Sequence, residues 1–434
     1  MKKSAQSSER ERLESATHRY QQAHAATTTG RYSDALRLVE EGLDLIASLP
    51  PSEEREHLRF ALTLERGWAR RFLGDYTALS DFQDVRQNSP VHAQRSEALV
   101  GIGDCYSKLG DYIAAENAYN QALEETRDTG ATLCRVRAWD GLGTLCWKQG
   151  RMDEAVRLLT QARMALRHTR DAFVLGNVLL SLGIAYAFAG RLDQAISAYE
   201  EALDCFRSLD DGHGMALVLN NLGEAHQELF NVESALHYHE EAVRLASNLG
   251  ILPILLDATR NMGVDLVLMG RYSEGMMCLE KALAQAREAG DKDLALQALY
   301  SMGDASLRQG RVAQALDLAA QLEAEASAVG SALHITRARM LRGRIHLAQG
   351  NRRAAQAVLQ EALTSAHALP SHLLLWQLHA ALGRASEDPE VARLHLQIAA
   401  DFIHQTADPL PDPALRARFL EAPEVQAVLR AAGR

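Results

Sequence analysis

The chain has few of the features that mark nucleic-acid-binding, disulfide-linked or membrane proteins. It carries 46 Lys and Arg against 56 Asp and Glu, a net charge of −10, so it lacks the basic surface with which a nonspecific nucleic-acid binder neutralises phosphates. Its five cysteines form no CxxC pair, and no apolar region follows the two N-terminal lysines, so we expect no secretory leader and a reducing cytoplasm. No apolar run reaches membrane-spanning length, so we expect no membrane partner.

Motifs of catalysis are also scarce. GxSxG, HExxH and GxxxxGK do not occur. The acidic pairs Glu124–Glu125, Glu200–Glu201 and Glu240–Glu241 recur at one repeat position, which is typical of a solvated helix face and not of a general acid and base. His237 and His239 are spaced so that they point apart on a helix, so we expect no shared metal. The sequence therefore predicts a protein that is not an enzyme and that has no cofactor.

What the sequence does have is a period of forty residues. Glycine recurs at this spacing without slippage, at positions 103, 143, 183, 223, 263, 303, 343 and 383. A second glycine follows seven residues later in most units, at positions 110, 150, 190, 270, 310 and 350, and alanines recur five and twelve residues after that. A fixed period of this size predicts one structural unit repeated along an elongated solenoid domain.

The spacing of apolar residues on both sides of Gly110 is helical, so the unit is predicted to be a helix, a turn and a second helix. A glycine inside a helix costs about 1 kcal/mol against alanine. We therefore infer that Gly103 and its equivalents allow the two helices to approach closely, with the alanines opposite. Gly110 and its equivalents are predicted to end the first helix with a positive φ. Cys105 and Cys146 occupy neighbouring first helices, which predicts small buried side chains.

These residues resemble the tetratricopeptide repeat (TPR) family over roughly residues 14–407. The signature residues are Trp139, Leu142, Gly143 and Ala155 in one unit, and Leu182, Gly183, Tyr186, Ala195, Tyr199 and Ala202 in the next. The common repeat has 34 residues, and the longer period is similar to the LGN/Pins and kinesin-light-chain-like branch. The tail resembles the end of TPR arrays in bacterial STAND-type signalling proteins, although the nucleotide-binding part of those proteins is absent.

The resemblance implies an all-α fold, a right-handed superhelical solenoid of about ten antiparallel helix hairpins. The predicted parts are a disordered N-terminus (1–12), two irregular hairpins (13–90), seven regular units (91–369), a last hairpin (370–407) and capping helices (408–434). The alanine-, arginine- and leucine-rich composition suggests a bacterial source.

The resemblance also implies that the first helices line a concave groove and that their outward residues touch a ligand. The residues in these positions are Arg137, Asp140, Trp147, Lys148, Asn177, Asn220, Asn221, Glu224, Asp257, Arg260 and Asn261. An asparagine amide offers both a donor and an acceptor, so Asn221 and Asn261 are predicted to hold peptide backbone. Trp147 is predicted to be an exposed anchor. The alternative is that these polar residues are only solvated.

One unit departs from the pattern, because Arg339 and Arg342 occupy slots that hold leucine elsewhere. A buried unpaired arginine is too costly, so we expect ion pairs with Glu323 or Glu325. With Arg337 and Arg344 these residues form a basic island. We favour a structural role for it over an anion site.

Three functions fit this architecture. The main hypothesis is a scaffold or adaptor that binds an extended peptide or helix of a partner protein. The second is a bacterial regulator that senses a small peptide and tightens around it. The third is a scaffold that assembles with copies of itself, although its irregular ends resemble caps.

Overall fold

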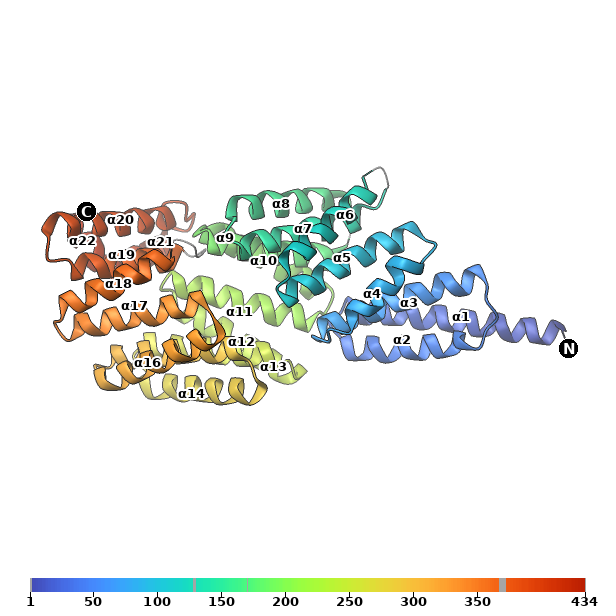
Figure 1. Ribbon diagram of the computed structural model, residues 1–434, viewed down its shortest axis with the longest axis horizontal. Coiled ribbons are helices and arrows are strands. Elements are labelled where there is room, and N and C mark those ends of the chain that lie inside the picture. The colour runs from blue at the N-terminus through green and yellow to red at the C-terminus, as the bar shows by residue number, and fades with distance from the viewer. Residues whose placement is uncertain (1, 128–129, 170, 367–371, 434) are drawn as a thin grey trace. The chain divides into compact units, whose positions relative to one another are not determined.

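The computed structural model describes residues 2–127, 130–169, 171–366 and 372–433, and in these residues the regular secondary structure is helical (Figure 1). The helices follow one another as sequential antiparallel pairs. The first helices are α1 (Lys2–Thr27), α3 (Glu53–Phe72), α5 (His92–Leu109), α7 (Thr132–Lys148), α9 (Ala172–Phe188), α11 (Gly212–Glu228), α13 (Leu252–Leu268), α15 (Lys292–Arg308), α17 (Ala332–Ala348) and α19 (His372–Ala385). The all-α repeat architecture predicted from the sequence is confirmed.

The second helices pack against the first helices of their own pairs. They are α2 (Tyr32–Ala47), α4 (Ala78–Asn88), α6 (Tyr112–Glu125), α8 (Met152–Ala165), α10 (Leu192–Ser208), α12 (Val232–Leu249), α14 (Tyr272–Ala289), α16 (Val312–Val329), α18 (Arg352–Ala366) and α20 (Pro389–Ala407). The tail forms α21 (Pro413–Glu421) and α22 (Pro423–Ala431). The predicted boundary between residues 369 and 370 lies outside the described residues. No described helix is long and apolar enough to cross a membrane.

The sequence predicts a disordered N-terminus over residues 1–12, whereas in the structure α1 begins at Lys2. The first twelve residues contain neither proline nor glycine, so nothing in them stops the helix from extending toward the terminus.

Close contacts divide the chain into two compact units, whereas the sequence favoured one elongated domain. The first unit comprises Met1–Lys148, Asp153–Leu182 and Glu201–Gly214, and the second comprises Gln149–Met152, Gly183–Glu200 and Met215–Arg434. An uninterrupted period cannot show where these contacts gather, because every unit carries the same apolar pattern.

Most of the forty-residue glycines make room for a large side chain of the second helix of their own pair, whereas at Gly303 this room is filled by Leu341 of α17. A Cβ built on Gly103 would lie 2.6 Å from the ring of Tyr119, and one on Gly143 would lie 2.6 Å from Leu159. At Gly223 the corresponding side chain is His239, at 2.3 Å. The close approach is confirmed, but the prediction that alanines lie opposite is wrong, because the space left by the missing Cβ is filled by rings and leucines.

The glycines between paired helices adopt the predicted left-handed conformation, with φ of 82° at Gly110 and 80° at Gly150. Phe230 takes the same position between α11 and α12 and keeps a positive φ of 54°. A side chain in this conformation costs roughly 1–2 kcal/mol. Its ring lies 6.2 Å from the ring of Phe419 on α21, and Phe419 is itself buried. The tail therefore covers the α11–α12 turn of the second unit as well as contacting α20.

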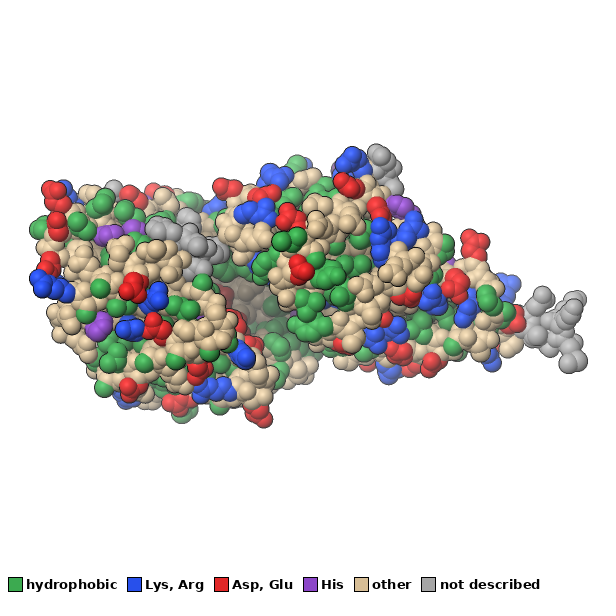
Figure 2. Space-filling view, viewed as in Figure 1, with side chains coloured by type: hydrophobic (Ala, Val, Ile, Leu, Met, Phe, Trp, Pro, Cys, Tyr) green, Lys and Arg blue, Asp and Glu red, His purple; other side chains and the backbone are tan. Residues whose placement is uncertain are grey.

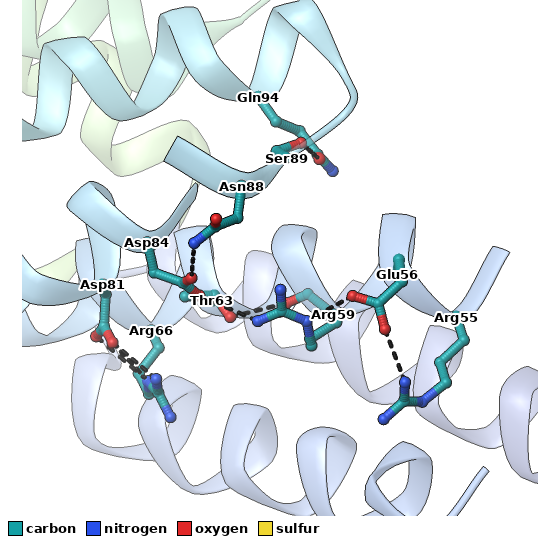
Figure 3. A network of polar contacts seen from close by, with 10 residues as sticks. All are labelled: Arg55, Glu56, Arg59, Thr63, Arg66, Asp81, Asp84, Asn88, Ser89 and Gln94. Atoms are coloured by element: carbon teal, nitrogen blue, oxygen red, sulfur yellow. Dashed lines mark hydrogen bonds and ion pairs between the residues drawn. The ribbon is translucent and has the colours of Figure 1, made fainter. Parts of the chain in front are cut away.

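In the first unit, α3 is joined to α4 by a chain of ion pairs (Figure 3). Arg59 donates to Glu56 at 2.9 Å and to Asp84 at 3.0 Å. Arg66 donates to the buried Asp81 at 2.7 Å. These pairs join the two helices of an irregular hairpin, in which Gly67, off the forty-residue spacing, lies against the ring of Phe82. Cys105 and Cys146 are buried, as predicted.

Candidate functional site

The predicted binding residues lie on α7, α9, α11 and α13, and first helices of neighbouring pairs contact one another. In the first unit α5 contacts both α3 and α7, and in the second unit α15 contacts both α13 and α17. Equivalent positions of successive repeats therefore become neighbours. Figure 2 shows acidic and basic side chains interspersed on the visible face rather than gathered into one basic patch. The two units are described separately below.

In the first unit, Arg137 on α7 is already paired. Its guanidinium forms an ion pair with Glu97 on α5 and lies 5.5 Å from the ring of Trp68 on α3. Burial lowers the pKa of Arg137, and Asp171 and Glu65 oppose this. Asn177 on α9 donates to the backbone carbonyl of Phe173 at 2.9 Å, so part of its amide is used within its own helix.

The carboxylate of Asp104 on α5 is the anchor of a second cluster in the same unit. It accepts a hydrogen bond from the hydroxyl of Tyr119 at 2.6 Å and lies 3.4 Å from Arg71 on α3. The guanidinium Nε of Arg71 is buried without a hydrogen-bond partner. Asp104 thus shares its charge between a phenol and one arginine that is incompletely satisfied.

Two lysines flank this anchor, Lys108 on α5 and Lys148 on α7. The ammonium of Lys148 lies 3.5 Å from the hydroxyl of Ser107, and neither lysine forms an ion pair with a described residue. Burial and the positive charges of Lys108 and Arg71 lower the pKa of Lys148 to about 8. Although the Lys108 side chain is exposed, desolvation by the surrounding protein atoms and the charge of Arg71 also lower its pKa. We call Arg71, Lys108 and Lys148 the cationic cluster.

Asp140 is half-buried on α7, and its Oδ1 atom has no hydrogen-bond partner. Burial raises the pKa of Asp140 to about 7; Ser181 opposes the shift and the charge of Asp104 adds to it. Its carboxylate is therefore only partly ionised at neutral pH. Trp147 is half-buried and not exposed, so its predicted exposure is wrong.

In the second unit, the predicted asparagines form a ladder across α11 and α13. The amide of Asn261 donates to Asn220 at 3.1 Å and to Glu224 at 2.9 Å, and the amide of Asn220 donates to Asp257 at 3.2 Å. Arg260 closes the ladder with a hydrogen bond to Asp257 at 2.9 Å. We call these five residues the amide ladder. Asn220 and Asn261 are buried, so the structure does not support the prediction that the Asn261 amide is open to a peptide.

Next to the ladder lies a buried pair that the sequence did not predict. The ring nitrogen Nδ1 of His239 lies 2.5 Å from Asp265, and both side chains are fully buried. Gln227 donates to the other carboxylate oxygen at 2.7 Å. His239 was expected to be packed in the slot of Tyr199, and this is confirmed. Among the described residues no group of three or more His, Cys, Asp and Glu side chains could hold a metal.

Two polar residues of α11 remain without a hydrogen bond to any described side chain, Asn221 and Glu228. Both are half-buried. Burial and the neighbouring charge of Glu224 raise the pKa of Glu228 to about 8, against a smaller opposite effect of Arg337. Of the predicted asparagines on α11 and α13, Asn221 is therefore the one that keeps a free amide.

The basic island on α17 is made largely of ion pairs, as we favoured. Arg342 and Arg339 both pair with Glu323, and Arg344 lies 2.5 Å from Asp304. The alternative prediction, that Glu325 pairs with these arginines, is wrong, because the Glu325 carboxylate pairs with Arg287. Arg337 lies 5.7 Å from the ring of Tyr300.

The sequence did not identify Arg71, Asp104 and Lys108 as site residues. Lys108 stands forty residues before Lys148, so the forty-residue period itself is a signal that points from Lys148 to Lys108. Arg71 belongs to an irregular hairpin outside the lattice, and no spacing in the sequence points to it.

Comparison with known proteins agrees with this architecture. A model of the tetratricopeptide repeat matches residues 94–168, 174–248 and 255–324, just over half of the chain. The chain belongs to the tetratricopeptide repeat family. No curated protein sequence matches it.

Several solved structures share the TPR fold. The Rap protein complexed with competence and sporulation factor is 15% identical with a TM-score of 0.54, and the match covers 97% of this chain and 99% of that one. The quorum sensor NprR from B. thuringiensis is 14% identical with a TM-score of 0.57, covering 79% of this chain and 97% of that one. A STAND protein with a TPR sensor from Pyrococcus horikoshii is 14% identical with a TM-score of 0.52, covering 76% and 52%. At these identities the likeness shows a shared fold.

Proposed function

We propose that this TPR protein is a regulator that senses a short peptide, and that the first helices form the binding face. We also place it in the forty-residue branch of the family and propose that it binds its ligand without catalysing a reaction. The Rap protein bound to competence and sporulation factor and the quorum sensor NprR have the same kind of array. This likeness supports a sensor more than it supports an adaptor for a large partner.

One observation carries the proposal: polar capacity is left unused on the first helices. Side-chain atoms of Glu65, Trp68, Arg71 and Asp140 are buried without hydrogen-bond partners, and all four residues lie on α3 or α7. Buried polar atoms in native structures are normally satisfied, so each such atom requires an explanation. A peptide offers an N–H donor and a carbonyl acceptor at most of its residues, so it matches this mixture of unsatisfied donors and acceptors.

The proposal is tested with short synthetic peptides of random sequence. Peptides retained with the protein during ultrafiltration are identified by mass spectrometry, and the radius of gyration is measured by small-angle X-ray scattering with and without them. A sensor retains a defined set of peptides and changes its radius of gyration. An adaptor retains peptides with no such change, and a self-assembling scaffold grows in mass with its own concentration. Retention of no peptide contradicts the proposal.

A further inference from the structure

The cationic cluster of the first unit has more positive charge than the chain supplies partners for. Arg71 shares Asp104 with Tyr119, while Lys108 and Lys148 have no carboxylate of their own among the described residues. Three cations therefore lie around the carboxylate of Asp104, and only Arg71 forms an ion pair with it. Elsewhere in the same unit arginines are paired, as Arg59 and Arg66 are on α3.

The position of the two lysines indicates that this excess belongs to a site. Both lie five residues after the repeat glycine, on neighbouring first helices that contact each other. Lys108 is exposed and Lys148 is half-buried, so a ligand reaches one directly and covers the other. A solvated lysine with no function would point away from like charges. Here the ammonium of Lys148 instead lies 3.5 Å from the hydroxyl of Ser107 on α5, within range of the charge of Lys108.

We propose that the cationic cluster binds a carboxylate of the peptide ligand. Arg71 offers a planar donor pair and the two ammonium groups offer point charges on either side. The carboxylate of Asp104 already pairs with Arg71, which favours a singly charged carboxylate over a phosphate dianion, because a second negative charge on the ligand is repelled. The inference rests on the proposed function and adds the chemistry of the group that is recognised.

The depressed pKa of Lys148 agrees with this inference. The shift reports repulsion by Lys108 and Arg71 that no internal anion relieves. A bound carboxylate relieves it and returns the pKa of Lys148 toward its ordinary value.

The test uses two libraries of short random peptides, one with free C-terminal carboxylates and one with C-terminal amides. They are presented to the wild-type protein, to the double variant Lys108→Met/Lys148→Met, and to the matched control Lys281→Met, which removes an exposed lysine of the second unit. We expect the double variant to lose at least tenfold in retention and the control to equal the wild type. Thermal unfolding of the double variant, expected at or above the wild-type temperature, shows that it is folded.

The libraries also separate the two sources of a carboxylate. If the C-terminus is bound, the amide library is not retained; if an acidic side chain is bound, amidated peptides containing Asp or Glu are retained. Equal retention of amidated peptides that lack Asp and Glu overturns the carboxylate site but leaves the peptide sensor standing. Undiminished retention by the double variant has the same meaning. Retention of nothing from either library overturns both proposals.

Discussion

The two units use the polar residues of their first helices in opposite ways. In the first unit the position five residues after the glycine holds Lys108 and Lys148, which have no ion-pair partner among the described residues. In the second unit the polar residues of α11 and α13 bond to one another, with Asn261 at the centre. Polar residues on the first helices therefore either stay without an ion-pair partner, as these lysines do, or bond to one another and join neighbouring repeats. A polar residue in a TPR groove is not by itself a sign of binding.

The largest effect is expected from Asp265→Ala, which disrupts the second unit, where polar residues bond to one another. The substitution leaves Nδ1 of the fully buried His239 unpaired, and it leaves the amide of the half-buried Gln227 only its long bond of 3.5 Å to the backbone carbonyl of Asn261. We expect a loss of about 3–5 kcal/mol in the stability of α12 and α13, measured by hydrogen exchange of their backbone amides. Asp265→Asn keeps an acceptor and loses less. A change below about 1 kcal/mol for Asp265→Ala contradicts a structural role for this pair.

Asn261→Ala removes the central rung of the amide ladder. It leaves the side-chain oxygen of Asn220 without a donor and leaves Glu224 only the guanidinium of Arg260, 3.5 Å away. We expect a cost of about 2–3 kcal/mol, measured in the same hydrogen-exchange experiment. The matched control is Asn221→Ala, which removes an amide that forms no hydrogen bond to a described residue and should change stability by less than about 0.5 kcal/mol. Equal effects of the two substitutions break the distinction between a ladder residue and a free one.

The pH dependence of peptide binding tests the first unit, where Lys108 and Lys148 have no ion-pair partner among the described residues. Lys148 gains its proton as the pH falls through about 8, and Asp140 loses its negative charge as the pH falls through about 7. Both changes make the site more positive, so a carboxylate binds more tightly at pH 6.5 than at pH 9, by about tenfold or 1.4 kcal/mol. The groups that face these two residues are Lys108, Arg71, Asp104, Ser107 and Ser181.

Calorimetry with a retained peptide across this range measures the effect. Lys148→Met should keep only the step near pH 7, and Asp140→Asn only the step near pH 8. Affinity that is constant or falls toward low pH is incompatible with a carboxylate at this place.

The smallest effect concerns the stability of the free protein. Because the folded-state pKa of Lys148 lies below its unfolded value, the unfolded chain binds more protons between about pH 8 and 10.5, and stability rises with pH across this window. Lys148→Met should therefore raise stability at pH 7 by up to about 1 kcal/mol and remove that part of the pH slope. Urea unfolding at pH 7 and pH 10 compares the variant with Lys281→Met. A loss of stability in Lys148→Met argues for a structural lysine.

Much of the fold could be predicted from the sequence, because one signal is repeated many times. Gly103 and Gly143 mark the close approach of paired helices, and Gly110 marks the turn, so an error in one unit is corrected by the others. The side chain that packs against each glycine could not be predicted from the sequence, because residues such as Tyr119 and His239 occur on solvated helix faces as well as in cores. Phe230 shows the same limit at the turn, since it adopts a positive φ that the sequence assigns to glycine.

The candidate site was less predictable than the fold. The repeat register located the polar positions of α11 and α13, but it could not tell that Asn220 and Asn261 bond to each other rather than to a ligand. That depends on the separation of two neighbouring helices. Arg71 could not be predicted as a site residue for a different reason. It lies on α3, in an irregular hairpin whose position beside α5 is set by packing and not by the repeat period.

The most direct test of the central claim is the pKa of Lys148 in the free protein. It can be measured by NMR of methyl-labelled lysines, with Lys148→Met to assign the signal. We predict a pKa of about 8 in the free protein and a rise when a carboxylate-bearing peptide is added. A pKa near 10.4 in the free protein, unchanged by peptide, would show that this lysine is simply solvated and would contradict the account.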